Sequence, residues 1–226
     1  MEKRGMNERI QALRELSVST QPHIDMERAK SETETYKKYE GQLSVPELRG
    51  QVLYDYFASK TLYIGDGELI VDEKGGSPQA SPTFPELCCH TVEDMHVMND
   101  RELINFTVQE EDFTVQEEVM IPYWDKRCIR NKILRQMTPE WKKAYECGIF
   151  TEFMEQRGPG HTVGSFKIYE KGFLDYKADI QAAIDELDFL NDKEALDKKN
   201  ELEGMKIACD AIMVLGERYA AYAREL

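Results

Sequence analysis

The chain has no apolar run long enough to cross a bilayer, few cysteines and a shortage of basic residues. Its longest apolar stretch, residues 207–215, is interrupted by Asp210, whereas a membrane-spanning helix needs about 20 apolar residues. The N-terminal residues are charged and no apolar segment follows them, so we expect no secretory signal. These absences argue against a membrane protein and against an exported one.

The shortage of positive charge limits the partners. Lys and Arg total 29 against 43 Asp and Glu, which gives a net charge of −14. Because an acidic surface repels phosphate backbones and anionic lipids, we expect neither nucleic acid nor membrane as a partner. With 41% hydrophobic and 32% charged residues in 226, the chain has an ordinary globular composition and can bury a core.

Cysteine and histidine offer little chemistry. The five cysteines are an odd number without a disulfide framework, which predicts reduced thiols and a cytoplasmic location. Cys88, Cys89, His90 and His96 invite a metal site, but adjacent thiolates rarely reach one tetrahedral ion, so we predict no metal and buried thiols beside a helix start. Cys147 stands in a helical stretch, which favours a core role over a nucleophile pair with His161.

Periodicity predicts a mainly α-helical chain with a small β-hairpin. Two short strands, 61–64 and 68–71, flank a Gly-Asp-Gly turn. Cap residues and apolar spacing predict helices over 8–17, from Asp25 to Gly41, from Pro46, from Thr138, over 174–190 and over 192–226. The last helix carries a strong apolar stripe up to Leu226 and no stop signal, so we expect the sequence to be cut inside a larger fold.

The segment Phe106–Glu118 repeats Phe-Thr-Val-Gln-Glu-Glu with a period of seven residues. On a helix this spacing would place Phe106 and Phe113 on nearly one face, although Thr and Val weaken the helical prediction. We interpret the repeat as a local duplication without a function of its own.

Residues 150–161, Phe-Thr-Glu-Phe-Met-Glu-Gln-Arg-Gly-Pro-Gly-His, form the most distinctive stretch. Glycine lets the backbone approach a ligand closely, and proline fixes one torsion between the two glycines. The turn therefore holds Arg157 and His161 on a rigid support. Local sequence alone leaves open a tight turn with a solvated histidine.

Several motifs resemble the glycyl radical enzymes of the pyruvate formate-lyase type. Residues 24–29 (Ile-Asp-Met-Glu-Arg-Ala), 32–41, 67–71 and the Pro85-Glu86 pair are similar to features shared across that family. Residues 88–94, 104–106, 137–141, 150–157, 171–175, 187–192 and 207–211 resemble the branch that dehydrates trans-4-hydroxy-L-proline. The resemblance covers essentially the whole chain, residues 1–226, as the N-terminal helical portion of the family's α/β barrel fold.

The resemblance implies a radical lyase. In that family a radical SAM iron–sulfur activating enzyme installs a glycyl radical, which generates a thiyl radical on a cysteine. The thiyl radical abstracts hydrogen from a small-molecule substrate, and a carboxylate assists loss of the hydroxyl as water, here to a pyrroline carboxylate. A closed cavity must protect such a radical from solvent. The resemblance also implies a homodimer for the intact protein.

Two positions match substrate-pocket residues of the family: Phe153, expected to pack on the ring, and His161, expected to make a polar contact. A core role for Phe153 stays open because aromatic residues dominate cores. The thiyl cysteine, its glutamate and the radical glycine are expected beyond Leu226. Asp72 stands where relatives usually carry glycine, which puts the local geometry there in question.

Two other functions remain open from the sequence. One is a glycyl radical lyase with a different small substrate, such as a diol or choline. The other is a catalytically inert helical module that binds a partner through its exposed final helix.

Overall fold

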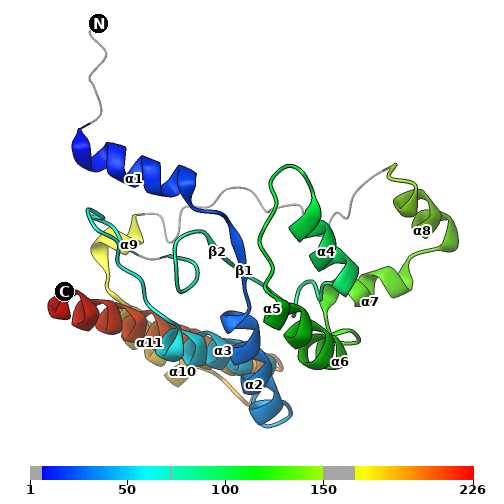
Figure 1. Cartoon of the computed structure of the whole chain (residues 1–226). Helices are drawn as coiled ribbons and strands as arrows, with labels where there is room; N and C mark the ends of the chain where they lie inside the picture. The colour runs from blue at the N-terminus through cyan, green and yellow to red at the C-terminus, as the bar shows by residue number, and fades with distance from the viewer. Residues whose placement is uncertain (1–6, 72, 150–165) are drawn as a thin grey trace, which may run out of the picture.

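A computed structural model describes residues 7–71, 73–149 and 166–226, and within them the chain is mainly helical (Figure 1). Two short strands, β1 (His23–Asp25) and β2 (Ala80–Pro82), pair in parallel, with Ile24 opposite Ser81. The helices are α1 (Glu8–Ser19), α2 (Glu27–Tyr39), α3 (Val45–Ser59), α4 (Val92–Asp100), α5 (Glu110–Val115), the π-helix η1 (Gln116–Met120), α6 (Ile121–Trp124), α7 (Ile129–Gln136), α8 (Pro139–Glu146), α9 (Lys167–Glu170), α10 (Phe173–Asp185) and α11 (Ala195–Glu225).

Local capping explains most helix boundaries. Ser44 and Glu47 form a capping box at the start of α3, and Thr138 caps α8 with its hydroxyl. Gly41 follows the C-cap of α2 and has a φ of +79°. This left-handed conformation is the one that ends many helices, so the predicted role of Gly41 is confirmed. The predicted cap of α2, Asp25, is wrong by one residue: the cap position is occupied by Met26, and the Asp25 carboxylate accepts the Glu27 N–H from the position before it.

The last two helices are shorter than predicted. The α10 helix ends at Asp185 because the Asp188 carboxylate accepts the N–H groups of Leu190 and Asn191, which forms a turn in place of further helix. The α11 helix starts at Ala195 with Glu194 at the cap position. Asp192, the predicted cap, lies three residues before the helix, where its carboxylate accepts the Glu194 N–H.

The predicted hairpin is wrong. Residues 61–71 form an irregular loop in which the Glu68 carboxylate accepts the Gly65 N–H and Arg9 donates to the Gly67 carbonyl. Leu69 and Ile70 are 81% and 93% exposed, so neither contributes an apolar strand face. Two strands need at least one buried face to pair stably, and none is provided here. Position 72, the Asp that departs from the family pattern, lies outside the described residues.

A three-helix layer forms one side of the molecule, where α3, α10 and α11 run side by side (Figure 1). Gly50 of α3 and Gly204 of α11 allow close contact: a Cβ on Gly204 would lie 2.6 Å from the Pro46 carbonyl oxygen. Arg218 of α11 donates to the carbonyls of Phe57 and Lys60 at the end of α3, at 2.7 and 2.8 Å. These contacts fix α11 against α3 at Gly204, in the N-terminal third of α11, and at Arg218, near its C-terminal end.

An apolar cluster packs β1 and the start of α2 against α4, η1 and α6. Its buried residues include Ile24, Met26 and Ala29 on one side and Met95, Met120 and Trp124 on the other. The Trp124 indole N–H donates to the Thr33 hydroxyl at 2.8 Å, and that hydroxyl donates to the Ala29 carbonyl. Tyr36 packs edge-on against Trp124 with ring centroids 4.9 Å apart. The α2 helix is thus shared between this cluster and the three-helix layer.

The two copies of the repeat adopt different structures, so Phe106 and Phe113 do not share a helical face, in keeping with the weak helical prediction for this segment. Phe106 lies before α5 and its N–H donates to the Met98 carbonyl, whereas Phe113 lies within α5 and stacks on His96 at 4.4 Å. Gln109 precedes the helix, and its counterpart Gln116 is buried in η1. Tertiary contacts therefore decide the conformation of an identical hexapeptide.

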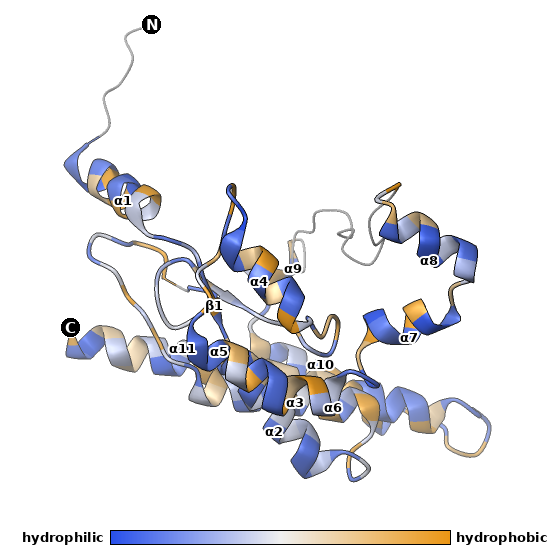
Figure 2. Ribbon diagram, turned by 45° about the vertical axis from the view of Figure 1, so that its right-hand side comes forward, coloured by the Kyte–Doolittle hydropathy of each residue, from blue (hydrophilic) through white to orange (hydrophobic). Residues whose placement is uncertain are grey.

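Hydrophilic and hydrophobic residues are interspersed along α11, as Figure 2 shows. Its buried positions are Ala195, Gly204, Cys209, Ala211 and Tyr219, whereas Met205 is 55% exposed. Among the described residues, no helix is both long and apolar enough to span a membrane.

Candidate functional site

The two predicted substrate-binding residues, Phe153 and His161, lie outside the described residues, as do Arg157 and the Gly-Pro-Gly turn. Their roles stay predictions. Before this gap the description ends at Ile149, just after α8, where the Ile149 N–H donates to the Ala144 carbonyl. After the gap it resumes at Phe166, next to α9. Cys147, expected in the core, is exposed at the end of α8, so that prediction is wrong.

The motif residues that carry the family resemblance meet in a buried ion cluster. Arg28 donates through Nη2 to Glu86 Oε1 at 2.8 Å and through Nη1 to Glu86 Oε2 at 3.2 Å. Arg28 Nη1 also lies 2.8 Å from Glu32 Oε2, one helical turn further along α2. Glu32 and Glu86 are only 1% and 6% exposed. One guanidinium therefore connects α2 to the loop before α4.

Two carboxyl groups share this one guanidinium, and their titration differs. Burial, followed by a hydrogen bond and like-charge repulsion from Glu86, raises the pKa of Glu32 to about 8. Burial works in the same direction on Glu86, but its hydrogen bonds with Arg28 and Glu32 outweigh that effect and lower its pKa. At neutral pH the pair therefore holds one proton, mainly on Glu32, and Glu86 carries the negative charge that balances Arg28.

A cavity of about 440 Å³ adjoins this cluster, between α2, α3 and α11. Most of its wall is apolar, and its polar lining includes Arg28, Glu32, Tyr36 and Arg49. Burial, and then the nearby Glu32, raises the pKa of the Tyr36 hydroxyl. Apolar pockets of this size with a few convergent polar groups are typical of small-molecule sites.

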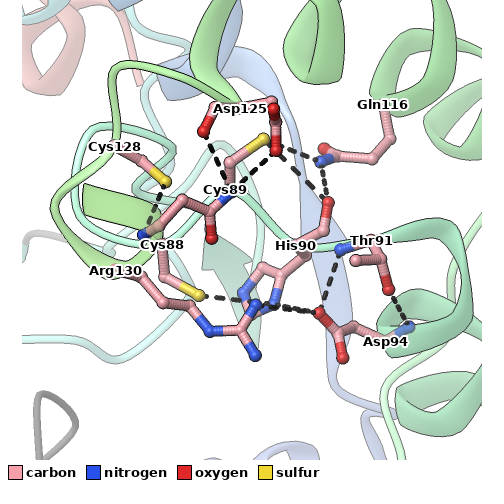
Figure 3. Close-up of polar contacts among 10 residues, drawn as sticks. Cys88, Cys89, His90, Thr91, Asp94, Gln116, Asp125, Cys128 and Arg130 are labelled. Atoms are coloured by element: carbon pink, nitrogen blue, oxygen red, sulfur yellow. Dashed lines mark hydrogen bonds and ion pairs between the residues drawn. The ribbon is translucent and has the colours of Figure 1, made fainter. Parts of the chain in front are cut away.

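A second polar cluster surrounds the start of α4 (Figure 3). Thr91 and Asp94 form a capping box: the Thr91 hydroxyl accepts the Asp94 N–H, and the Asp94 carboxylate accepts the Thr91 N–H. Asp94 also lies 3.8 Å from His90 Nδ1 and 3.7 Å from Arg130 Nη1. Gln116 from η1 donates to the His90 carbonyl at 2.6 Å.

This cluster is charged at neutral pH. The interactions of His90 with Asp94, and then with Cys88, raise the pKa of the imidazole to about 10, and the interaction with His90 lowers the pKa of Asp94 to about 2. Burial raises the pKa of the Cys89 thiol to about 12. Buried Cys89 beside the helix start agrees with the sequence prediction, while Cys88 is half-buried.

The second cluster is structural. A nucleophilic triad needs the two imidazole nitrogens to serve different partners, but the Cys88 sulfur (3.8 Å) and the Asp94 carboxylate both approach Nδ1 of His90. In the described parts of the chain, no three His, Cys, Asp or Glu side chains are grouped so as to hold a metal ion. The cluster joins the start of α4 to η1 and to α7.

Sequence reasoning missed the cavity and the role of the Arg28 cluster. The Arg28 to Glu32 spacing of four residues was a usable signal, because such residues face the same side of a helix. The participation of Glu86 had no local signal, since it lies 58 residues from Arg28. Motif matching selected all three residues without revealing that they meet.

Comparison with known proteins settles the family. The model of the "pyruvate formate lyase-like" family matches residues 6–226. The chain belongs to the pyruvate formate lyase-like family. It is 56% identical over 223 residues to trans-4-hydroxy-L-proline dehydratase of Clostridioides difficile, an alignment that covers 99% of this chain and 28% of that protein.

Solved structures agree with this family assignment. The crystal structure of hydroxyproline dehydratase from Clostridioides difficile, with trans-4-hydroxy-L-proline bound, matches with a TM-score of 0.90 and 56% identity, over 99% of this chain and 28% of that one. The B12-independent glycerol dehydratase of Clostridium butyricum matches with a TM-score of 0.85 and 26% identity, over 99% and 29%. The mainly helical fold thus matches the N-terminal part of glycyl radical enzymes, and the chain spans little more than a quarter of either relative.

Proposed function

We propose that this chain is the N-terminal part of a glycyl radical dehydratase that removes water from trans-4-hydroxy-L-proline to give a pyrroline carboxylate. The observation that carries the proposal is the 56% identity to the hydroxyproline dehydratase of Clostridioides difficile, about twice the 26% identity to the glycerol dehydratase of Clostridium butyricum. The identity extends over 99% of the chain, including the stretch with the candidate pocket residues.

In this proposal residues 1–226 contribute a pocket wall and leave the radical chemistry to the rest of the protein. Phe153 would pack on the pyrrolidine ring and His161 would make a polar contact with the substrate. The thiyl cysteine, the assisting glutamate and the radical glycine would follow Leu226. A radical SAM activating enzyme, a homodimeric assembly and a cytoplasmic location complete the proposal; the five free thiols are in keeping with that compartment.

The test is a substrate comparison with the intact, anaerobically activated protein. We expect water loss from trans-4-hydroxy-L-proline and little from glycerol, with both reactions followed by product mass. Phe153→Ala and His161→Ala should lower hydroxyproline turnover strongly, and a substitution at exposed Cys147, such as Cys147→Ser, should not. Preferential turnover of glycerol would refute the substrate assignment and leave the family membership untouched.

A further inference from the structure

Two neighbouring parts of the chain carry opposite charge. Residues 110–118, which form α5 and the first half of η1, hold five acidic residues and no basic one. Residues 126–143, which include α7 and the first half of α8, hold seven basic residues and one acidic residue, in a chain whose net charge is −14. An uneven distribution of charge creates local fields that the net charge does not describe, so each segment attracts a surface of the opposite sign.

The acidic side chains come from the seven-residue repeat. Each copy ends in a Glu-Glu pair, so Glu110 lies seven residues before Glu117 and eight before Glu118. That spacing is about two helical turns, and α5 continues into η1 without a break, so these three carboxylates form an acidic row on one side of the helix. All three are exposed. Of the four glutamates in the two pairs, only Glu111 has an ion pair with another described residue, Lys30, at 3.6 Å.

The α7 helix presents exposed positive charge. Lys132 and Arg135 are three residues apart, which places them on one side of α7, and we call this pair the basic face. Arg135 donates to two backbone carbonyls, at 2.9 and 2.8 Å, so no carboxylate neutralises it. Within the described ranges, the ion pairs of this region belong to Arg127 and Arg130 instead. The basic face therefore has no acidic partner in this part of the chain.

The acidic row and the basic face lie close together on the molecule. Both ribbon views place α6 between α5 and α7 (Figures 1 and 2). A patch with negative charge beside positive charge is complementary to a second copy of itself related by a two-fold rotation, because each half then meets its opposite. A nucleic acid fits less well, since the acidic row and the net charge of −14 would repel its phosphates.

We propose that this patch is an interface between two copies of the protein, in which the basic face of one subunit meets the acidic row of the other. The inference rests on the homodimer of the proposed function and adds the surface that forms it. Two-fold symmetry repeats every ion pair, so individually weak surface pairs add up and also fix the register of the subunits. The repeat, interpreted from the sequence as a duplication without function, then supplies the acidic half of the interface.

Reversal of the charges in the intact protein tests the interface. One variant combines Lys132→Glu with Arg135→Glu, and a second combines Glu117→Lys with Glu118→Lys. At low salt, each variant should dimerise about tenfold or more weakly than the parent protein in analytical ultracentrifugation, because attractions become repulsions and the symmetry counts each of them twice.

An equimolar mixture of the two variants distinguishes contacts between subunits from contacts within one subunit. In the mixture a wholly acidic patch meets a wholly basic one, so heterodimers should form with about the affinity of the parent and be visible by native mass spectrometry. This rescue also shows that both variants are folded. The matched control combines Lys193→Glu with Lys199→Glu, two exposed positions away from the patch, and should dimerise like the parent.

Three results would overturn the proposal. The first is parental dimerisation in both charge-reversal variants. The second is weakened dimerisation that mixing does not restore, which would mean that these charges act within one subunit. The third is an intact parent protein that stays monomeric at every concentration. Since association is measured without turnover, failure here is distinguishable from failure of the proposed dehydratase function, which hydroxyproline turnover tests separately.

Discussion

Replacing Gly204 of α11 with alanine tests the packing of the three-helix layer. The new Cβ would lie 2.6 Å from the Pro46 carbonyl oxygen and 2.7 Å from its carbon, both backbone atoms, whereas ordinary contact begins at 3.4 Å. The helices must therefore separate by roughly 0.8 Å, or α3 must shift. Such overpacking costs about 1–3 kcal/mol, and the rigidity of the clashing atoms places this site at the upper end.

Gly216 of the same helix is the matched control. A Cβ there meets nothing within 4 Å, so alanine adds only its helix propensity, a gain of about 1 kcal/mol over glycine. Gly204→Ala gains the same helix propensity, but the clash outweighs this gain. Its net loss in free energy of unfolding is about 2 kcal/mol. The two variants should thus differ by about 3 kcal/mol in free energy of unfolding.

Urea unfolding of the 226-residue chain, followed by helical circular dichroism, measures that difference. Hydrogen exchange in the intact protein provides a local readout, and α3 and α11 should exchange faster in Gly204→Ala only. If Gly204→Ala proved as stable as Gly216→Ala, the close approach of α3 and α11 would be refuted.

Three further predictions concern buried polar contacts. Because the pKa of Glu32 is raised in the folded state, its contribution to stability is present below its ordinary pKa and lost as pH rises through about 8; unfolding titrations should show this loss, and Glu32→Gln should remove it. Arg218→Ala should cost about 2–3 kcal/mol because two charge-assisted hydrogen bonds to the end of α3 disappear, and a Lys substitution that recovered full stability would contradict their fork geometry. Thr33→Val should cost about 1–3 kcal/mol in thermal unfolding by leaving the Trp124 N–H unpaired, whereas Thr33→Ser should stay close to the parent.

Helix starts were the most predictable part of the fold, because each depends on a few neighbouring residues. Thr138 caps α8 as its side chain predicts, and α3 begins at Val45, one residue before the predicted start at Pro46. Helix ends were less predictable: the early end of α10 depends on the side chain of Asp188, which stops a run whose apolar periodicity continues.

Strand pairing and the repeat could not be predicted from local sequence. Residues 68–71 have strand-forming composition, but the fold leaves Leu69 and Ile70 in solvent and pairs His23–Asp25 with Ala80–Pro82 instead. The repeat has one sequence and two structures, since Gln116 is recruited to the His90 carbonyl and Gln109 is not. Pairing partners more than fifty residues apart leave no signal within a short window.

The candidate site was predictable only through family resemblance. That resemblance selected Arg28, Glu32 and Glu86, which form the buried ion cluster, and it identified Phe153 and His161 as substrate contacts, which remain predictions. The cavity beside Glu32 could not be predicted, because it exists only where α2, α3 and α11 meet.

The central claim is that the intact protein containing this chain is a glycyl radical dehydratase of hydroxyproline. The most direct test activates that protein anaerobically with a radical SAM activating enzyme, confirms a glycyl radical by electron paramagnetic resonance, and then adds trans-4-hydroxy-L-proline. The account predicts a radical signal followed by formation of a pyrroline carboxylate. A clear radical signal with no consumption of hydroxyproline would contradict it.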